Sequence, residues 1–454
     1  MLEKLRIQNF KSWQDTGDIA FGSLTGFFGT NSSGKSSILQ FLLMLKQTVE
    51  SSDRSRVLHL GDDKSYVDLG TMDDVIHNHT EPNSFFFYLT WALPKTQRLP
   101  IENYYLTSYS GTHTFKHVTF RAQIDKLHNT VSVYRFQFDA KDWKAGLIRQ
   151  PSSDYQIFVD SLLPYDPEKA EEVALPKPIK FYAFPVEAKR LFPNQSFFDE
   201  LASEFETLFG TIYYLGPIRD YPRRTYLWGG DDTADVGQRG ERAIVALLAS
   251  SNRKPTINMG KGQPKRTVEE HVAHWLKELG LIYSFKVQPI APNRKEYEVR
   301  IQRTAESASV FLTDVGFGVS QILPVLVLLF YVPEGSTVIL EQPEIHLHPA
   351  VQAGLADVFI DAIKRRKLQI VLESHSEHLL QRLQRRIAEE IIDEEAIKLY
   401  FTSIKEGRSE LTTLELDEYG NIHNWPAGFF GNAFEEAAAK MKAEMKRKLR
   451  EQQS

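Results

Sequence analysis

The chain has 454 residues, a formal net charge of −5 and a hydrophobic content of 42%, enough for two or three domain-sized units with a sizeable core. The absence of cysteine excludes disulfides, thiolate metal sites and cysteine nucleophiles. The mildly acidic balance means that any nucleic-acid contact must be local. The start, MLEKLRIQNF, has no signal-peptide core, and the longest apolar stretch, 322–332, is too short to cross a bilayer. We therefore expect a cytoplasmic protein with no membrane contact.

The first 80 residues predict strand, loop and helix in that order. KLRIQNF alternates as a strand does, and SLTGFFG ends a second, more apolar strand. A glycine-rich turn follows, and SSILQFLLMLKQTV then carries apolar residues at helical spacing. Residues 1–80 are therefore the expected N-terminal part of the main domain.

Residues 81–210 have a different pattern and predict a β-rich insertion. Aromatic residues alternate in SFFFYLTW, VSVYRFQF and IKFYAFP, which indicates several strands joined by turns. One predicted helix, FFDELASEFETLFG, closes the segment. No heptad run is long enough for a coiled-coil arm.

Residues 211–400 alternate predicted strands and helices, which indicates an α/β fold with a largely parallel sheet. TIYYLGPIR, STVILE and LQIVLES read as strands, and FKVQPI with YEVRIQR reads as a strand pair. Helices are expected in ERAIVALLAS, in VEEHVAHWLKELGL, in the apolar run 322–332 and over about 350–365. Residues 401–454 form a C-terminal segment that is expected to end in a solvated helix with a basic end.

GTNSSGKS, from Gly29 to Ser36, matches the phosphate-binding pattern G-x-x-x-x-G-K-[ST] between a predicted strand and a predicted helix. Backbone N–H groups of such a loop and the helix N-terminus face phosphate oxygens. Gly34 allows close approach of the backbone, Lys35 reaches the β- and γ-phosphates, and the Ser36 hydroxyl ligates Mg²⁺. The sequence thus predicts a site for nucleotide phosphates with Mg²⁺.

A phosphate loop of this kind needs a metal-holding acid on a neighbouring buried strand. TVILE supplies Glu341, about three hundred residues further along the chain. A gap of that length excludes a small GTPase or a nucleoside kinase. It implies a domain interrupted by a large insertion, for which 81–210 is the candidate.

Several segments resemble the ATPase head of the ABC superfamily in its SMC, RecF and overcoming-lysogenization (OLD) branch. They are LRIQNFKSW, GTNSSGKSS, DVGFGVSQILPVL, VILEQPEIHLHP and IVLESHSEHLL, in that order. With IHNWPAGFF near the end, the chain is more similar to bacterial ABC-type ATPases, some of which are ATPase subunits of antiphage defence operons such as the Septu systems. The resemblance covers 1–45 and 311–380 and does not extend to 81–210. It implies an ABC-type ATPase head with a largely parallel sheet core, interrupted by a β-rich insertion.

The resemblance also implies which residues contact the nucleotide. It places Lys11 and Ser12 near the phosphates. The resemblance assigns the following residues to the phosphate loop: Gly29, Asn31, Ser32, Ser33, Gly34, Lys35, Ser36 and Ser37. Val315–Gln321 stands at the family's signature motif, which caps the γ-phosphate bound by the other subunit. There Gly316 takes the usual serine position, Gly318 keeps a glycine, and Ser320 and Gln321 remain to supply polar contacts.

Three further residues take catalytic positions by the same resemblance. Glu341 stands where the family holds Mg²⁺ with an aspartate, and His375 matches the switch histidine that senses γ-phosphate. Gln342 replaces the glutamate that polarises the attacking water, and an amide can orient water but cannot accept its proton. Either Glu344 acts as the base instead, or the site has no base and hydrolyses ATP slowly.

The resemblance implies an ATPase that forms a homodimer or higher homo-oligomer around ATP and controls an effector. Nothing in the chain resembles a nuclease, so the expected effector is a nuclease encoded nearby. One alternative is a RecF- or SMC-like DNA-repair ATPase. DNA could then be contacted through Arg219, Arg223 and Arg224, which otherwise lie in a solvated loop or form salt bridges between subunits. Another alternative is a nucleotide-gated scaffold without hydrolysis, which Gln342 favours. A metal held by His346, His348, His375 and His378 is a weaker hypothesis than plain loop positions.

Overall fold

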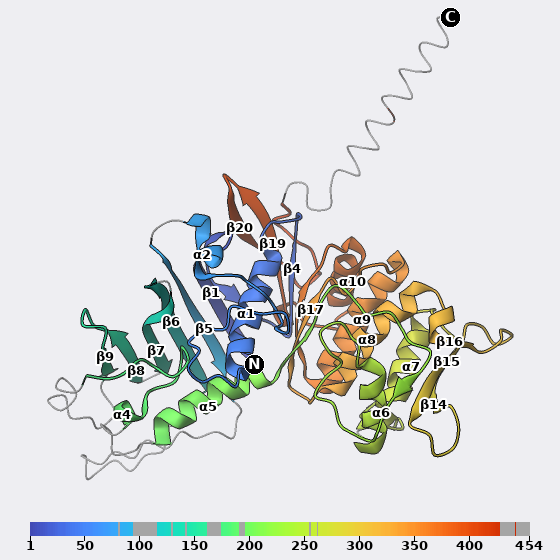
Figure 1. Cartoon of the computed structure of the whole chain (residues 1–454). Coiled ribbons are helices and arrows are strands. Elements are labelled where there is room, and N and C mark those ends of the chain that lie inside the picture. The colour runs from blue at the N-terminus through green and yellow to red at the C-terminus, as the bar shows by residue number, and fades with distance from the viewer. Residues whose placement is uncertain are drawn as a thin grey trace, which may run out of the picture.

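A computed structural model describes residues 1–79, 82–93, 116–128, 130–140, 143–160, 174–189, 196–253, 256–260, 262–426 and 441. Two large sheets lie side by side, with α1 (Lys35–Glu50) between them (Figure 1). The helices of the C-terminal half cover the face of the second sheet that points away from α1 (Figure 1). The predicted basic helix at the end of the chain lies outside the described residues.

The first sheet is antiparallel and joins the N-terminus to the segment 81–210. β1 pairs with β5, where Ile7 lies opposite Phe87. Every second side chain of β5 is buried, among them Phe87 and Trp91, as the aromatic alternation predicted. The predicted β-rich segment therefore extends the sheet that residues 2–20 begin, while the division into domains stays a prediction. The sheet consists of β1 (Leu2–Phe10), β2 (Trp13–Asp15), β3 (Ile19–Ala20), β5 (Ser84–Ala92), β6 (His117–Leu127), β7 (Thr130–Ala140), β8 (Trp143–Arg149) and β9 (Tyr155–Asp160).

The second sheet carries the site. Its first five strands are parallel, and only β20 runs antiparallel to its neighbour. Ile339 of β17 faces the core shared with α1, whereas Val338 and Leu340 face the core on the other side. Both faces of this sheet are thus buried, and the predicted α/β class with a largely parallel core sheet is confirmed. In spatial order the strands are β10 (Ile212–Leu215), β17 (Thr337–Glu341), β18 (Gln369–Glu373), β4 (Leu24–Gly29), β19 (Ile397–Lys405) and β20 (Arg408–Leu414).

The helices divide between the two cores. α1 buries Ile38, Phe41 and Leu42 against the first core, and the apolar α8 is buried along most of its length in the second core. No helix of the described residues is both long and apolar enough to span a membrane. The further helices are α2 (Met72–Val75), α4 (Val186–Lys189), α5 (Ser196–Gly210), α6 (Ala243–Arg253), α7 (Val268–Glu278), α8 (Phe317–Tyr331), α9 (Pro349–Arg366) and α10 (Glu377–Ala388).

A small lobe packs beside the second core (Figure 1). The predicted pair FKVQPI and YEVRIQR forms its two long strands, β14 and β15, which are antiparallel. The four strands of this sheet are β11 (Tyr226–Leu227), β14 (Ser284–Pro289), β15 (Glu296–Gln302) and β16 (Val310–Phe311), and a separate pair is β12 (Thr256–Ile257) with β13 (Arg266–Thr267). Single 3₁₀ turns occur at η1 (His77–His79), η2 (Leu312–Asp314) and η3 (Glu394–Ala396).

Candidate functional site

The phosphate-binding pattern forms the turn between β4, which ends at Gly29, and α1, which begins at Lys35. Gly29 and Gly34 have φ angles of 142° and 95°, which favour glycine. A Cβ on Gly29 would lie 2.1 Å from the Thr402 carbonyl oxygen, so a larger residue does not fit. The Lys35 Nζ donates to the carbonyls of Gly29 and Thr30, at 3.2 and 2.7 Å. The lysine thus folds over the loop where phosphate oxygens are expected.

Residues within the loop divide into exposed and buried positions. Asn31 and Ser32 are exposed, and Ser37 is half-buried. Ser33 is buried, donates its hydroxyl hydrogen to the Thr30 carbonyl at 2.7 Å, and hydrogen-bonds the Thr402 hydroxyl. The loop conformation is therefore held by its own side chains and by β19.

The β1–β2 turn and β20 support the loop from the other side. Trp13 Nε1 donates to the Gly34 carbonyl at 3.0 Å. A Cβ on Gly34 would lie 2.8 Å from the Ser12 Oγ and 2.6 Å from the Ser409 Oγ. Lys11 Nζ donates to the Gln40 Oε1 of α1 at 2.7 Å. The structure thus brings Ser12 against the loop and Lys11 against the helix that follows it.

Two carboxylates end neighbouring strands beside this loop. Glu341 and Glu373 are the last residues of β17 and β18 and lie directly opposite each other. The Ser36 hydroxyl donates to Glu373 Oε2 at 2.7 Å, while the Tyr214 hydroxyl donates to Glu341 Oε1 at 3.1 Å. Sequence reasoning chose Glu341 and missed Glu373. The missed signal was that LQIVLE ends a buried strand in an acid, as TVILE does.

Burial disfavours the charged form of both carboxylates, and the charge of Glu373 adds to this effect at Glu341. Burial, together with the charge of Glu373, raises the pKa of Glu341 to about 7. Burial also raises the pKa of Glu373, against the opposing effects of its Ser36 hydrogen bond and of Lys35. Burial lowers the pKa of Lys35. A divalent cation among these oxygens would relieve the repulsion, and carboxylate and hydroxyl oxygens are the ligand types that Mg²⁺ prefers. The residues present therefore fit Mg²⁺, with Glu373 added to the predicted Ser36 and Glu341.

The loop after β17 links Glu341 to the turn that carries His375. Gln342 has a φ of 43°, and its N–H donates to the Glu373 carbonyl at 2.9 Å. Glu344 is only 6% exposed, and its Oε1 accepts the His375 backbone N–H at 2.7 Å. Burial raises the pKa of Glu344. One oxygen of the only carboxylate proposed as a substitute base is therefore committed to the turn that carries His375.

His375 is an exposed residue that lies two residues after the end of β18. Burial of part of the ring, and secondarily the positive charge of Lys35, lowers its pKa. His375 is therefore a neutral hydrogen-bonding group over more of the physiological pH range than a free histidine. The structure thus brings Gln342, Glu344 and His375 together beside the acid pair.

The predicted signature motif forms the start of α8, with Gly316 as the residue before the helix. Gly316 is exposed, and Gly318 lies half-buried in the first turn. Ser320 and Gln321 are 7% and 4% exposed, and the Ser320 hydroxyl donates to the Phe317 carbonyl at 2.8 Å within its own helix. The two polar residues expected to contact a second subunit's phosphate are thus turned inward. The exposed residues at this end of the helix are Gly316 and Phe317.

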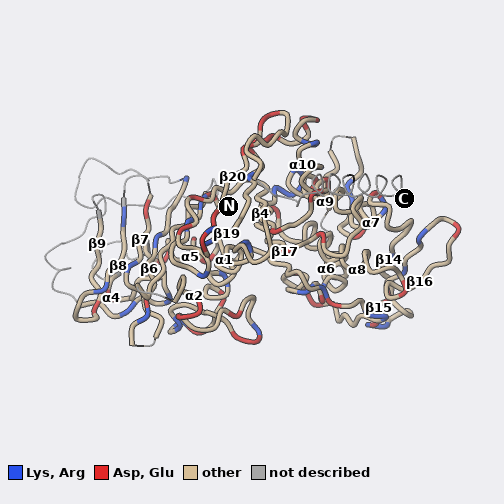
Figure 2. Tube along the Cα trace, turned by 90° about the horizontal axis from the view of Figure 1, so that it is seen from above, with Lys and Arg blue, Asp and Glu red and all other residues tan. Residues whose placement is uncertain are grey.

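The predicted basic contact with DNA is wrong for Arg219, which is 6% exposed. Arg224 is exposed but pairs with Asp314 at 2.8 Å, and Arg223 is exposed. Figure 2 shows basic and acidic residues interspersed along the described trace, without a continuous basic stripe. Among the residues that the structure describes, no group of three His, Asp or Glu side chains, the four histidines included, is arranged so that it could hold a metal ion.

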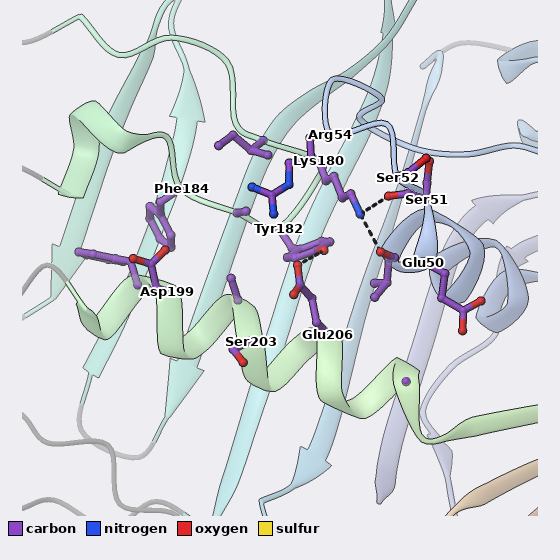
Figure 3. A pocket seen from close by; sticks show the side chains of 16 residues that line it. Glu50, Ser51, Ser52, Arg54, Lys180, Tyr182, Phe184, Asp199, Ser203 and Glu206 are labelled. Atoms are coloured by element: carbon purple, nitrogen blue, oxygen red, sulfur yellow. Dashed lines mark hydrogen bonds between the residues drawn. The ribbon is translucent and has the colours of Figure 1, made fainter. Parts of the chain in front are cut away.

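A cavity of about 650 Å³ lies at the opposite end of α1 from the phosphate loop (Figure 3). Lys180 donates to the carbonyls of Val49 and Ser51 at 2.7 and 3.0 Å, and the Tyr182 hydroxyl donates to Glu206 at 2.7 Å. These bonds link the C-terminal end of α1 to α5 and to the segment before it. The cavity is separate from the acid pair and contributes no group to it.

Three protein-family models match parts of the chain. An AAA ATPase domain model matches residues 1–142, and a model described as "AAA domain, putative AbiEii toxin, Type IV TA system" matches residues 287–381. The chain carries an AAA-type ATPase domain. Its two matched parts hold the phosphate loop and Glu341 with Glu373. A third model, "protein of unknown function (DUF3696)", matches residues 392–439, which include β19 and β20.

No match to a curated protein was found. Among solved structures, the chain is similar to an Smc head bound to the C-terminal winged-helix domain of ScpA, at 11% identity and a TM-score of 0.43, covering 91% of this chain and 98% of that one. An SMC head domain from Thermotoga maritima matches at 11% identity and 0.40, covering 91% and 99%. An Smc head domain with an extended coiled coil, bound to the C-terminal domain of ScpA and derived from Pyrococcus furiosus, matches at 10% identity and 0.41, covering 98% and 99%. Similarity at this level does not bear on function.

Proposed function

We propose that the chain is an ABC-type ATPase that binds ATP with Mg²⁺, hydrolyses it slowly and closes as a homodimer around the nucleotide. We further propose that closure controls a separate effector, a nuclease encoded nearby, in cytoplasmic antiphage defence. The observation that supports the ATPase part is the phosphate loop between β4 and α1 with Glu341 and Glu373 beside it. The defence role rests on the resemblance of the sequence motifs to Septu-like ATPase subunits.

Each residue of the proposed site has a role in nucleotide binding or hydrolysis that follows from its position. Backbone N–H groups from Gly29 to Ser36 bind phosphate oxygens, and Lys35 exchanges its bonds to the loop carbonyls for bonds to phosphate. Ser36, Glu341 and Glu373 would hold Mg²⁺, which when bound neutralises charge on the phosphates. Gln342 orients a water molecule, and His375 donates a hydrogen bond toward the terminal phosphate. Positioning and charge carry most of phosphoryl transfer, so slow hydrolysis is compatible with an amide at position 342.

Dimer closure follows from the exposed N-terminus of α8. A helix N-terminus binds anions, and Gly316 leaves room for a phosphate to approach the first turn. In a two-fold arrangement, each α8 would face the nucleotide of the other subunit, so both sites close together. ATP, which carries the γ-phosphate, should therefore favour the dimer more than ADP does.

A nucleotide-gated scaffold is a second candidate, and the position of Glu344 favours it. Glu344 binds the His375 N–H through Oε1, is buried and leaves only Oε2 without a partner among the described residues, and position 342 carries an amide in place of an acid. A DNA-repair ATPase has less support, because Arg219 is buried and Arg224 is paired.

Calorimetry and light scattering test the proposal together. ATP with Mg²⁺ should bind the wild type and shift it from monomer to dimer, and Lys35→Ala should abolish both effects. The exposed Lys405→Ala is the matched control and should change neither. ATP binding by the Lys35 variant with wild-type affinity would show that the glycine-rich segment is only a turn. The effector part is tested by asking whether the neighbouring gene's product co-purifies with the wild type.

A further inference from the structure

Arg219 is a buried cation next to the acid pair that the mechanism above does not use. It lies four residues after the end of β10, the strand that borders β17. Its side chain is buried, and neither Nε nor Nη1 has a hydrogen-bond acceptor among the described residues. A guanidinium with unpaired N–H groups in a protein interior is unfavourable by several kcal/mol. We therefore expect the N–H donors of Arg219 to bind a group that the described residues do not supply.

The surroundings of Arg219 are negatively charged. Burial lowers its pKa to about 10, while Tyr214, Glu341 and Glu344 act in the opposite direction. The guanidinium therefore remains protonated at neutral pH and lies within charge range of the metal acid. The Tyr214 hydroxyl donates a hydrogen bond to Glu341 Oε1, and Glu344 Oε1 accepts one from the His375 backbone N–H. The nearby acids thus offset the charge of Arg219 without satisfying its buried N–H groups.

The order of the strands indicates where a hydrogen-bond acceptor for the Arg219 N–H groups would lie. From β4 outward, the carboxyl ends carry the phosphate loop, then Glu373 on β18, then Glu341 on β17, and then the Arg219 segment after β10. Mg²⁺ held by Ser36, Glu341 and Glu373 would neutralise charge on the phosphates of a bound nucleotide. Because the phosphate loop and the Arg219 segment lie on opposite sides of the acid pair, we expect the terminal phosphate of a bound nucleotide on the Arg219 side of the site.

We propose that Arg219 binds the terminal phosphate of the nucleoside triphosphate held by the phosphate loop of its own chain. This inference rests on the proposed ATP site and adds the group that distinguishes a triphosphate from a diphosphate. A guanidinium presents planar N–H donors that match phosphate oxygens, often two at a time. In the empty site the same charge offsets part of the repulsion among the acids.

A different result is expected if Arg219 serves only as a structural counter-charge to the acids. It would lower stability when removed and would weaken ATP and ADP binding equally. A phosphate ligand acts on ATP alone, because ADP does not present a γ-phosphate. The ratio of the two affinities therefore separates the two roles.

The experiment measures ATP and ADP affinities by calorimetry with Mg²⁺ for the full chain and for Arg219→Gln, Arg219→Lys and the control Arg223→Gln. Arg223 is an exposed arginine in the same loop. Arg219→Gln should lower ATP affinity at least about tenfold, as expected for a charge-assisted hydrogen bond, and ADP affinity less than about threefold. Arg219→Lys should recover part of the loss, and Arg223→Gln should change neither affinity.

An equal fall for ATP and ADP, or no fall in a folded Arg219 variant, would overturn the inference. Folding is checked by circular dichroism. If Arg219→Gln does not fold, Arg219→Lys carries the test, because it keeps the charge and loses the planar donors. If the wild type binds ATP through Lys35 and the ATP-to-ADP ratio is unchanged in the Arg219 variants, only this inference fails. If the wild type binds no ATP, the proposed function fails with it.

Discussion

Ser36 donates its hydroxyl hydrogen to Glu373, with 2.7 Å between Oγ and Oε2, although 337 positions of sequence separate the two residues. The bond joins the first turn of α1 to the last residue of β18. It connects the predicted phosphate loop directly to the strand that ends two residues before His375.

The first prediction concerns Glu373. Glu373→Gln should lower the Mg²⁺-dependent affinity for ATP at least about tenfold, because a charge-assisted contact near the cation is lost. Affinity measured without Mg²⁺ should change little. Calorimetry in the presence and absence of Mg²⁺ separates the two effects. The exposed acid Glu377, in the first turn of α10, provides the control Glu377→Gln. Equal losses with and without Mg²⁺ would assign Glu373 a structural role.

The second prediction concerns Gly34. Gly34→Ala should abolish ATP binding and lower the stability of the chain. Its φ of 95° costs a larger residue about 1–3 kcal/mol, and the new Cβ would also lie 2.6 Å from the Ser409 Oγ. Gly407→Ala is the control, because that glycine has a φ of 78° and a Cβ added there would meet no atom within 4 Å. Thermal unfolding should show the larger loss for Gly34→Ala, and only that variant should lose ATP affinity. Similar losses in both variants would mean that backbone strain alone explains the effect.

The third prediction is a pH dependence. A carboxyl with a pKa raised to about 7 in the folded protein, from an ordinary value of 4.5, stabilises the fold below the ordinary value. That stability is lost as the pH rises through about 7. The unfolding temperature of the nucleotide-free protein should therefore fall between about pH 5 and about pH 8. Calorimetric scans across this range should show a weaker fall for Glu341→Gln and an unchanged one for Glu306→Gln, which removes an exposed acid. A fall of equal size in Glu341→Gln would place the titrating group elsewhere.

The loop and the metal acid could be predicted from the sequence because both are local patterns. Gly29 to Ser36 have fixed spacing, and Glu341 ends an apolar run of strand length. The parallel strands of the second sheet could be predicted for the same reason, since their residues are apolar on both faces.

Contacts between distant segments could not be predicted in this way. Periodicity shows that β5 is a strand but not that it pairs with β1, because pairing depends on partners far apart in sequence. The bond from Ser36 to Glu373, and the burial of Arg219, depend on strand order in the same way. The resemblance assigns polar contacts with the nucleotide to Ser320 and Gln321. They instead lie on buried positions of α8, because nearly the whole circumference of this apolar helix packs into the core.

The last prediction concerns Gln342 and Glu344, and it decides whether the site has a catalytic base. General-base help is typically worth about 10²–10⁴-fold in rate. Because Glu344 is buried and holds the His375 N–H, Glu344→Gln, whose amide oxygen can still accept that bond, should change kcat by less than about threefold. Gln342→Glu places a carboxylate of the same shape directly after the metal acid and should raise kcat at least about tenfold. Steady-state ATPase rates of the two variants check both expectations. Lys35→Ala provides the inactive reference. The opposite pattern, a tenfold fall in Glu344→Gln with Gln342→Glu unchanged, would identify Glu344 as the base, and a wild-type kcat already within about 1–10³ s⁻¹ would contradict slow hydrolysis.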